Sequence, residues 1–317
     1  MDPINLNIEN FAALPHPAWQ MVAVLLVVGY GAHFAFAGYF LAASTQLAPK
    51  YRFGTWLSAV VMVAAGLSLL REFSVWNEAF SFDGAVWTRK PDEVFSNAYR
   101  YANWTITIPL LLAQLLLALG LPKRDLHRRF ALLTGTAWVM IWTGLIGQFY
   151  ESTSIGTLLI WGAISTVPFL YLVWGVRDAL IEGKRHTPAR LHVWHDNLFW
   201  FFLFFWGLYA LAYMVPTVSD GPTAIVARQA MFTVADVFSK IVYGVILTRY
   251  LLRKSALEGY APAVEALEEW PEQPASQSSA PLPTPADAPR PAPGEVAAAN
   301  LPAAPVSSPV PGEAIAR

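Results

Sequence analysis

The chain has 317 residues, of which 55% are hydrophobic and only 14% are charged. A typical soluble domain carries about 25% charged residues, so this composition favours a membrane protein. The net charge of −1 gives no basis for nucleic-acid binding, and the absence of cysteine excludes a disulfide framework, a thiol nucleophile and a Cys-based zinc site.

Apolar stretches long enough to cross a bilayer, which takes about 20 helical residues, recur along the chain. They must be helical, because a backbone in lipid has to satisfy its own hydrogen bonds. In chain order the predicted spans are 17–43, 54–79, 95–121, 127–149, 154–179, 193–217 and 223–251. The predicted fold class is therefore all-α, a seven-transmembrane-helix bundle formed by residues 17–256.

Positive charges gather in the links on one side of the predicted bundle. The links after spans 1, 3 and 5 and the end of span 7 hold Lys50, Arg52, Lys123, Arg124, Arg128, Arg129, Arg177, Lys184, Arg185, Arg190, Arg249, Arg253 and Lys254. The opposite side has little beyond Arg89 and Lys90 in its loops. The positive-inside rule then places the N-terminus outside and the C-terminus in the cytoplasm, so residues 1–16 are predicted to form an extracellular cap.

The character of the chain changes near its C-terminal end. Residues 257–317 are rich in Pro, Ala and Ser and contain few aromatic residues. Such a segment buries too little apolar area to offset its chain entropy. A disordered cytoplasmic tail is predicted here, solvated in the simplest interpretation and able to bind a partner in another.

Asp236 and Lys240 stand in an otherwise apolar stretch of span 7, VADVFSKIVYGVIL. Their i,i+4 spacing puts both side chains on one helix face. Ionisable groups inside a membrane usually serve a function, although a structural ion pair between helices is the alternative. A lysine in such a site loses its proton readily enough to form a Schiff base with an aldehyde.

Span 3 carries a row of polar side chains, Arg100, Asn103, Thr107 and Gln114, within YRYANWTITIPLLLAQ. At about 100° per residue these side chains fall on one face of the helix. Taken singly, each amide or hydroxyl is explained by a hydrogen bond to a neighbouring helix. Aligned with an arginine in the membrane, they predict an ion path.

Aromatic residues recur at helical spacing in span 6, where Trp206, Tyr209 and Tyr213 follow each other at i, i+3 and i+7. Span 3 adds Tyr101 and Trp104. Such a stripe is usually core packing. Beside a buried lysine it also suits a flat, conjugated ligand.

These features together resemble the microbial rhodopsin family, over residues 5 to 268. The matching segments are RYANWTITIPLLLAQ, GLIGQFYES, IWGAIST, FWGLYALAYMVP and ARQAMFTVADVFSKIVYGVIL. The resemblance implies that Lys240 carries all-trans retinal as a protonated Schiff base and that Asp236 is its counterion. The residues that it places around retinal are Lys240, Tyr101, Trp104, Leu111, Gly162, Ser165, Trp206, Tyr209 and Tyr213.

The triplet Asn103, Thr107 and Gln114 resembles that of the bacterial chloride-pumping rhodopsins. Outward proton pumps of the family carry acids at the positions of Asn103 and often Gln114, and sodium pumps carry an aspartate at that of Thr107. The resemblance therefore implies a light-driven inward chloride pump, which is a transporter and not an enzyme, with chloride held by Asn103, Thr107 and Lys240.

Charge counting agrees with this expectation. Lys240 and Arg100 against Asp236 leave the predicted site near +1, and a mobile anion would cancel that charge. The resemblance also places Arg100, Gln148, Glu151 and Arg228 on the outer ion path and Gln114 on the inner one. An inward proton pump, a sodium pump with altered chemistry and a photosensor that signals through the tail remain as alternatives.

A few residues depart from the family pattern. Arg71 and Glu72, near the outer end of span 2, are expected to form a local pair or to alter the entry path. The small Gly162 would leave lateral room for a carotenoid antenna. His186, His192 and His195 cluster at the inner start of span 6, where solvated histidines are expected, so no metal site is predicted. The resemblance also implies a homo-oligomer, a pentamer, in the inner (plasma) membrane of a bacterium.

Overall fold

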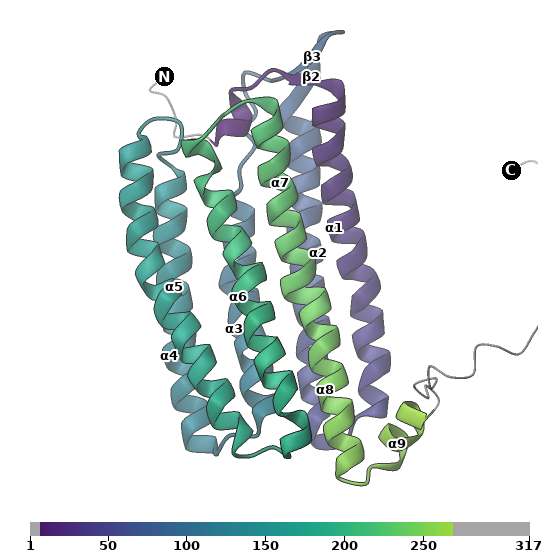
Figure 1. The fold of residues 1–317 in the computed structure, drawn as a ribbon. Coiled ribbons are helices and arrows are strands. Elements are labelled where there is room, and N and C mark those ends of the chain that lie inside the picture. The colour runs from purple at the N-terminus through teal and green to yellow at the C-terminus, as the bar shows by residue number, and fades with distance from the viewer. Residues whose placement is uncertain (1–6, 269–317) are drawn as a thin grey trace, which may run out of the picture. The chain divides into compact units, whose positions relative to one another are not determined.

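A computed structural model describes residues 7–268 of the chain. Within them, seven helical segments are long and apolar enough to cross a membrane (Figure 1). They are His16–Gln46, Pro49–Ala79, Ala98–Leu119, Lys123–Gln148, Ile155–Lys184, Ala189–Thr217 and Pro222–Leu257. The predicted seven-helix bundle is confirmed, and the protein is a multi-pass membrane protein.

The first six spans are built on the α-helices α1 (His16–Ala43), α2 (Arg52–Ala79), α3 (Ala98–Leu119), α4 (Lys123–Gln148), α5 (Ile155–Lys184) and α6 (His192–Met214). Single 3₁₀ turns extend some of them: η2 (Ser44–Gln46), η3 (Pro49–Tyr51), η4 (Ala189–Leu191) and η5 (Val215–Thr217). The seventh span consists of α7 (Pro222–Asp236), the π-helical segment η6 (Val237–Val242) and α8 (Tyr243–Leu257). A short helix, α9 (Ala261–Glu268), follows it.

Helices that follow each other in the chain pack side by side, and α7 closes the bundle by packing against α1 as well as α6. The distribution of polar and apolar side chains is the reverse of that in a soluble protein, with charged groups inside and apolar groups outside. Arg100, Glu72 and Asp236 are fully buried, whereas Val167 and Trp200 expose 70% and 65% of their surface. Apolar side chains on the outside and charges on the inside are what a lipid environment requires.

One end of the bundle, the sheet end, carries a small structure that the sequence did not predict (Figure 1). The 3₁₀ turn η1 (Ile8–Asn10) precedes β1 (Leu14–Pro15), while β2 (Phe80–Phe82) and β3 (Val86–Arg89) link α2 to α3. The three strands pair antiparallel in the order β1-β3-β2. The cap expected at residues 1–16 therefore includes the strand β1, which pairs with β3 in the loop between spans 2 and 3.

The turn between β2 and β3 is fixed by two residues. Gly84 adopts a φ of +101°, a conformation that a side chain would strain. The Asp83 carboxylate accepts hydrogen bonds of 2.8 Å from the backbone N–H groups of Ala85 and Val86. These hydrogen bonds hold the pKa of Asp83 below its ordinary value.

The opposite end of the bundle, the α9 end, is closed by contacts from residues after α8. The Glu258 carboxylate accepts a hydrogen bond of 2.5 Å from the Tyr51 hydroxyl and lies 2.9 Å from Lys50 Nζ. Partial burial acts to raise the pKa of Glu258, but these two partners hold it below the ordinary value. Arg52 also donates to the Tyr260 hydroxyl at 2.9 Å.

Helix α9 occupies the beginning of the segment predicted as a disordered tail, and its Ala263 is fully buried. The predicted boundary at residue 257 therefore falls before an ordered helix. The remainder of that prediction, residues 269–317, lies outside the described residues.

Candidate functional site

The centre of the site is the ion pair between Lys240 and Asp236, both buried in the seventh span. Lys240 belongs to the π-helical segment η6, an irregularity that is frequent at functional sites. Its Nζ donates one hydrogen bond to Asp236 Oδ1 and another, of 3.1 Å, to the Tyr209 hydroxyl oxygen. A buried amine is thus held at a fixed position beside a carboxylate.

Asp236 receives hydrogen bonds from four side chains on three segments, η6, α3 and α6. Besides Lys240, the donors are Arg100 Nη1 at 2.9 Å, Trp104 Nε1 at 3.3 Å and the Tyr209 hydroxyl at 2.8 Å. Hydrogen bonds and positive charges directed at a carboxylate stabilise its ionised form. Asp236 is therefore held as an anion between two cations.

A cavity of about 350 Å³ lies next to this ion pair, between aromatic side chains of α3 and α6. Its volume falls in the range of small-molecule sites, about 300–1,000 Å³. Seven of the nine residues predicted to surround retinal line it: Tyr101, Trp104, Gly162, Ser165, Trp206, Tyr209 and Tyr213. Leu111 lines a smaller pocket that shares Trp206 with the first.

The sequence reasoning missed the rest of the lining, which comes from α3, α4, α5 and the end of α6: Ile108, Met140, Ile141, Gly144, Leu159, Ala163, Thr166, Phe169, Ala210 and Met214. Most are apolar or small residues without a distinctive spacing, so no local pattern could have singled them out. They complete an apolar wall for a conjugated ligand.

Two glycines in the cavity wall pack closely against other lining residues. A Cβ atom at Gly162 would lie 2.8 Å from Cε1 of Tyr213, which is closer than side chains tolerate. A Cβ atom at Gly144 would lie 3.4 Å from both Ser165 Oγ and Tyr101 Cε1. An apolar, aromatic-lined space beside a buried amine fits an elongated aldehyde such as retinal. The carotenoid expected from the small size of Gly162 stays a prediction.

The neutral side chains Asn103, Thr107 and Gln114 on α3 are buried. The Thr107 hydroxyl donates to the backbone carbonyl of Asn103 at 2.9 Å, and Gln114 Nε2 donates to Ser58 Oγ at 3.0 Å. Within the described residues, Asn103 Oδ1 and Gln114 Oε1 have no hydrogen-bond partner. In this arrangement the Thr107 hydrogen already has an acceptor, and the unpartnered Asn103 atom, Oδ1, is itself an acceptor.

Glu72 belongs to this site, and the expected local pair with Arg71 is wrong. Glu72 Oε2 lies 2.8 Å from Arg100 Nη2, whereas Arg71 lies 3.7 Å from Glu78. Successive helical residues point in different directions, so Arg71 faces outward while Glu72 faces the interior. The charge count made from spans 3 and 7 alone therefore omitted a carboxylate. The signal was present, since Glu72 is an acid within an apolar span.

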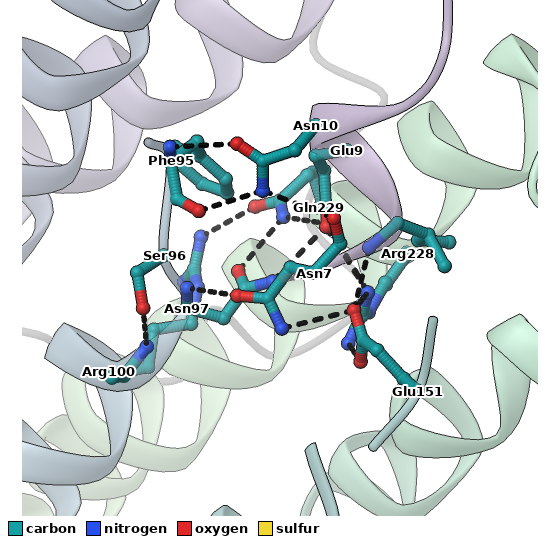
Figure 2. Close-up of polar contacts among 12 residues, drawn as sticks. Asn7, Glu9, Asn10, Phe95, Ser96, Asn97, Arg100, Glu151, Arg228 and Gln229 are labelled. Atoms are coloured by element: carbon teal, nitrogen blue, oxygen red, sulfur yellow. Dashed lines mark hydrogen bonds and ion pairs between the residues drawn. The ribbon is translucent and has the colours of Figure 1, made fainter. Parts of the chain in front are cut away.

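A second buried cluster fills the sheet end of the bundle (Figure 2). Arg228 is fully buried and pairs with Glu151 at 2.7 Å and with Glu9 at 3.2 Å. Glu151 also accepts hydrogen bonds from the Asn7 side chain and the Ile8 backbone. Glu151 and Arg228, both expected on the outer ion path, contact each other here, and Glu9 joins them from a position 219 residues before Arg228.

The two clusters are connected through Gln229. Its Oε1 accepts from Arg100 Nη2 at 2.9 Å, and its Nε2 donates to Glu9 at 2.7 Å and to Asn97 at 3.0 Å. Gln148, also predicted here, is buried, but its amide has no hydrogen-bond partner among residues 7–268. A continuous polar network thus runs from Arg228 to Lys240 through Gln229 and Arg100.

We expect Arg228→Gln to lower the free energy of unfolding by about 3–5 kcal/mol. Removing one partner of a buried ion pair costs this much because the other charge is left without compensation, and here two carboxylates would be left. Thermal unfolding in detergent, followed by circular dichroism, measures the loss. Arg71→Gln is the matched control, since Arg71 is half exposed in a pair of 3.7 Å. Equal melting temperatures for both variants would contradict the structural role of Arg228.

The three histidines near the start of α6 contact protein groups, and the expectation that they are solvated is wrong for His195, which is fully buried. His192 Nε2 lies 2.9 Å from the Lys184 carbonyl and 3.0 Å from that of Thr187. His195 Nε2 lies 3.1 Å from the Tyr250 hydroxyl, and His186 lies 3.5 Å from Glu182. These contacts fix the ends of α5, α6 and α8 to one another.

A bundle of seven membrane-spanning helices around a buried lysine defines a class of membrane proteins, and comparison with known proteins identifies the family. Residues 20–254 match the family model described as "Bacteriorhodopsin-like protein". The chain belongs to this family of microbial rhodopsins, whose members bind retinal through a lysine.

Solved structures agree with this assignment. The chain is similar to xanthorhodopsin, described as a light-driven ion pump with dual chromophore, at 32% identity and a TM-score of 0.72, covering 78% of this chain and 98% of that one. It is also similar to a thermophilic rhodopsin at 28% identity and a TM-score of 0.73, covering 78% and 99%.

Among curated proteins, a bacteriorhodopsin of Haloterrigena sp. (strain arg-4) is 32% identical over 166 residues, which is 51% of this chain and 64% of that protein. The "Bacteriorhodopsin-II-like protein" of Haloquadratum walsbyi is 28% identical over 149 residues. The chain spans about three fifths of the length of the curated relatives it matches.

Proposed function

We propose that this protein is a light-driven pump that moves chloride inward, from the sheet end of the bundle to the α9 end. Retinal bound to Lys240 would supply the light-driven step, because isomerisation turns the positively charged N–H at Lys240 from one side of the site to the other. The remaining steps depend on side chains of the chain itself.

The proposal that the transported ion is an anion depends mainly on one observation, the ionised form of Asp236 beside Lys240. Asp236 is held by four donors, two of them cationic, so it is a poor acceptor for the proton on Lys240. Asn103, Thr107 and Gln114 on α3 cannot take up or return a proton at neutral pH. With no proton moving through this row, an ion attracted by the positive charge at Lys240 is the natural cargo.

Chloride would bind between the Lys240 nitrogen and the side chain of Asn103, whose amide N–H groups donate to an anion. Thr107 borders this position one turn further along α3. On the sheet end, Arg100 and Arg228 provide positive charge along the entry path, together with Gln148 and Glu151. On the α9 end, the side chains of Gln114 and Ser58 offer hydrogen bonds to the departing ion.

Three other functions make different demands on the site. A sodium pump needs a carboxylate that takes the proton from Lys240, and the α3 row has none. An inward proton pump gains some support from the buried acid Glu72, but Arg100 lies between Glu72 and Asp236. A photosensor would signal through residues after α9, and it would show no light-driven ion flux.

The visible absorption band provides the test of the proposed function. Chloride beside Lys240 stabilises the positive charge there in the dark state, so replacing chloride by sulfate should shift the band to longer wavelength. Returning chloride should reverse the shift with a saturating concentration dependence. A band that does not move between chloride and sulfate would count against the chloride site and favour the proton pump or the photosensor.

A further inference from the structure

Glu72 is an acid next to Arg100 for which the proposed pumping steps give no role. It projects from α2 into the bundle and is fully buried. Oε2 lies 2.8 Å from Arg100 Nη2 in an ion pair, but neither carboxylate oxygen has a hydrogen-bond partner among the described residues. A buried carboxylate with one ion-pair partner and no hydrogen bond is costly to keep ionised, and it can become neutral by taking a proton on Oε1, the oxygen that does not contact Arg100.

The charges around Glu72 balance only while no anion is present. Lys240 and Arg100 are positive, and Asp236 and Glu72 are negative, so the four groups sum to zero. Chloride beside Lys240 would bring the sum to −1 in a buried site, where charge interactions are strong. One added proton restores neutrality.

Other charged or titratable groups face this region, and their contacts make them poorer proton acceptors. From α3, Arg100 is a permanent cation, and from α7, Asp236 has four donors. From η1, Glu9 is compensated by Arg228 and Gln229. From α1, Tyr30 packs against Phe73, and His33 bonds the Gly29 carbonyl through Nδ1. A proton on His33 would add a cation close to Lys240, which repels it.

We infer that Glu72 is a proton-binding site coupled to chloride: it is ionised when the anion site is empty and takes up one proton from water when chloride binds beside Lys240. The carboxyl group then has an O–H bond, and Arg100 loses one of its two carboxylate partners. Arg100 is thereby released to interact with the incoming anion. This inference rests on the proposed chloride site and adds that chloride binding consumes a proton.

Two dark measurements on the purified pigment test the coupling. In unbuffered solution, a pH electrode records the protons taken up when chloride is added to the sulfate form. In buffered solutions from pH 5 to 9, chloride titrations of the visible band give the apparent Kd. We expect up to one proton per chloride and, on the alkaline side, an apparent Kd that rises about tenfold per pH unit, as proton linkage requires.

Glu72→Gln removes the titrating group and keeps its size. In this variant chloride addition should take up no protons, and the apparent Kd should be independent of pH and close to the tight value of the wild type at low pH. Glu78→Gln is the matched control from the same helix, since Glu78 is exposed in its pair with Arg71, and it should behave as the wild type. If Glu72→Gln forms no pigment, Glu72→Asp, which keeps a carboxyl group, should retain proton uptake with a displaced pH range.

The outcomes separate this inference from the proposed function. Chloride binding without proton uptake in the wild type, or undiminished uptake in Glu72→Gln, would overturn the role of Glu72 and leave the chloride pump standing. Uptake that persists in Glu72→Gln would point to His33 or Glu9 as the proton site. If chloride does not shift the band in the wild type or in Glu72→Gln, both the chloride site and the coupling are wrong.

Discussion

Lys240→Ala is expected to abolish the visible pigment and all light-driven transport. Among the residues near the cavity, Lys240 provides the amine that is both buried and adjacent to the aromatic lining at Tyr209. Without it a retinal aldehyde has nothing to bond to, and its absorption stays in the near ultraviolet. The measurement is an absorption spectrum after all-trans retinal is added to the purified variant.

Lys254→Ala is the matched control for this variant. Lys254 is also a largely buried lysine of the seventh span, but its Nζ donates to the Ala118 carbonyl at the α9 end of the bundle. We expect it to form a pigment with an unchanged visible band. Circular dichroism of Lys240→Ala should still show a folded helical protein. A visible band in folded Lys240→Ala, or its loss in Lys254→Ala, would contradict the assignment of Lys240.

Asn103→Asp is expected to remove chloride binding. An ionised aspartate at this position would lie in direct contact with the chloride, about 4 Å away. Two like charges at 4 Å repel by roughly 4 kcal/mol at an effective dielectric constant of 20, which corresponds to a loss of affinity of about a thousandfold. The aspartate would also give Lys240 a second counterion, so the band should lose its dependence on chloride.

Titration of the visible band with sodium chloride measures this effect. Asn77→Asp provides the control, because Asn77 is an exposed residue of α2 whose amide bonds only the Phe73 carbonyl within its own helix. Its chloride dependence should equal that of the wild type. If Asn103→Asp kept the affinity of the wild type, the anion would have to lie elsewhere in the protein.

The fold was predictable to a large extent because lipid imposes a simple rule on the sequence. Each span needs about 20 apolar residues in helical form, and the seven stretches could be recognised one by one. Their ends were less predictable. The fifth span continues to Lys184, five residues beyond its predicted end at 179, because charged side chains beyond the apolar core can remain helical in the headgroup region and in water.

The sheet at the end of the bundle could not be predicted from its own residues. Strand β1 has two residues and β3 has four, which is too short for an alternating pattern to be recognised. Pairing between Leu14 and Trp87 joins segments 73 residues apart, and only the packing of α1 against α2 brings them together. The same holds for the π-helical turn at Lys240, which leaves no signal in the apolar pattern.

Site residues could be predicted from the sequence where they share one face of a single helix. Asp236 and Lys240 share a face of the seventh span, and Asn103, Thr107 and Gln114 share a face of the third. Contacts between helices were not accessible in this way. Glu72 was expected either to pair with its sequence neighbour Arg71 or to alter the entry path, and Glu9 was not recognised. Each of these acids meets its arginine only through the arrangement of the bundle.

The correction at Glu72 changes the electrostatic argument for chloride. With three charges the site had a net charge of +1 and attracted an anion directly. With Glu72 included, the site is neutral when empty and can hold chloride at little cost only if a proton enters as well. Anion binding and local protonation therefore become one event, and acid conditions should favour chloride uptake.

Ion flux under illumination tests the proposed pump most directly. Cells that produce the protein, suspended in unbuffered sodium chloride, are lit while the pH of the medium is recorded. Inward chloride transport makes the cell interior negative and draws protons in, so the medium should become alkaline, a protonophore should enlarge the change, and sulfate in place of chloride should abolish it. A pH change that the protonophore abolishes, or that persists in sulfate, would contradict chloride pumping.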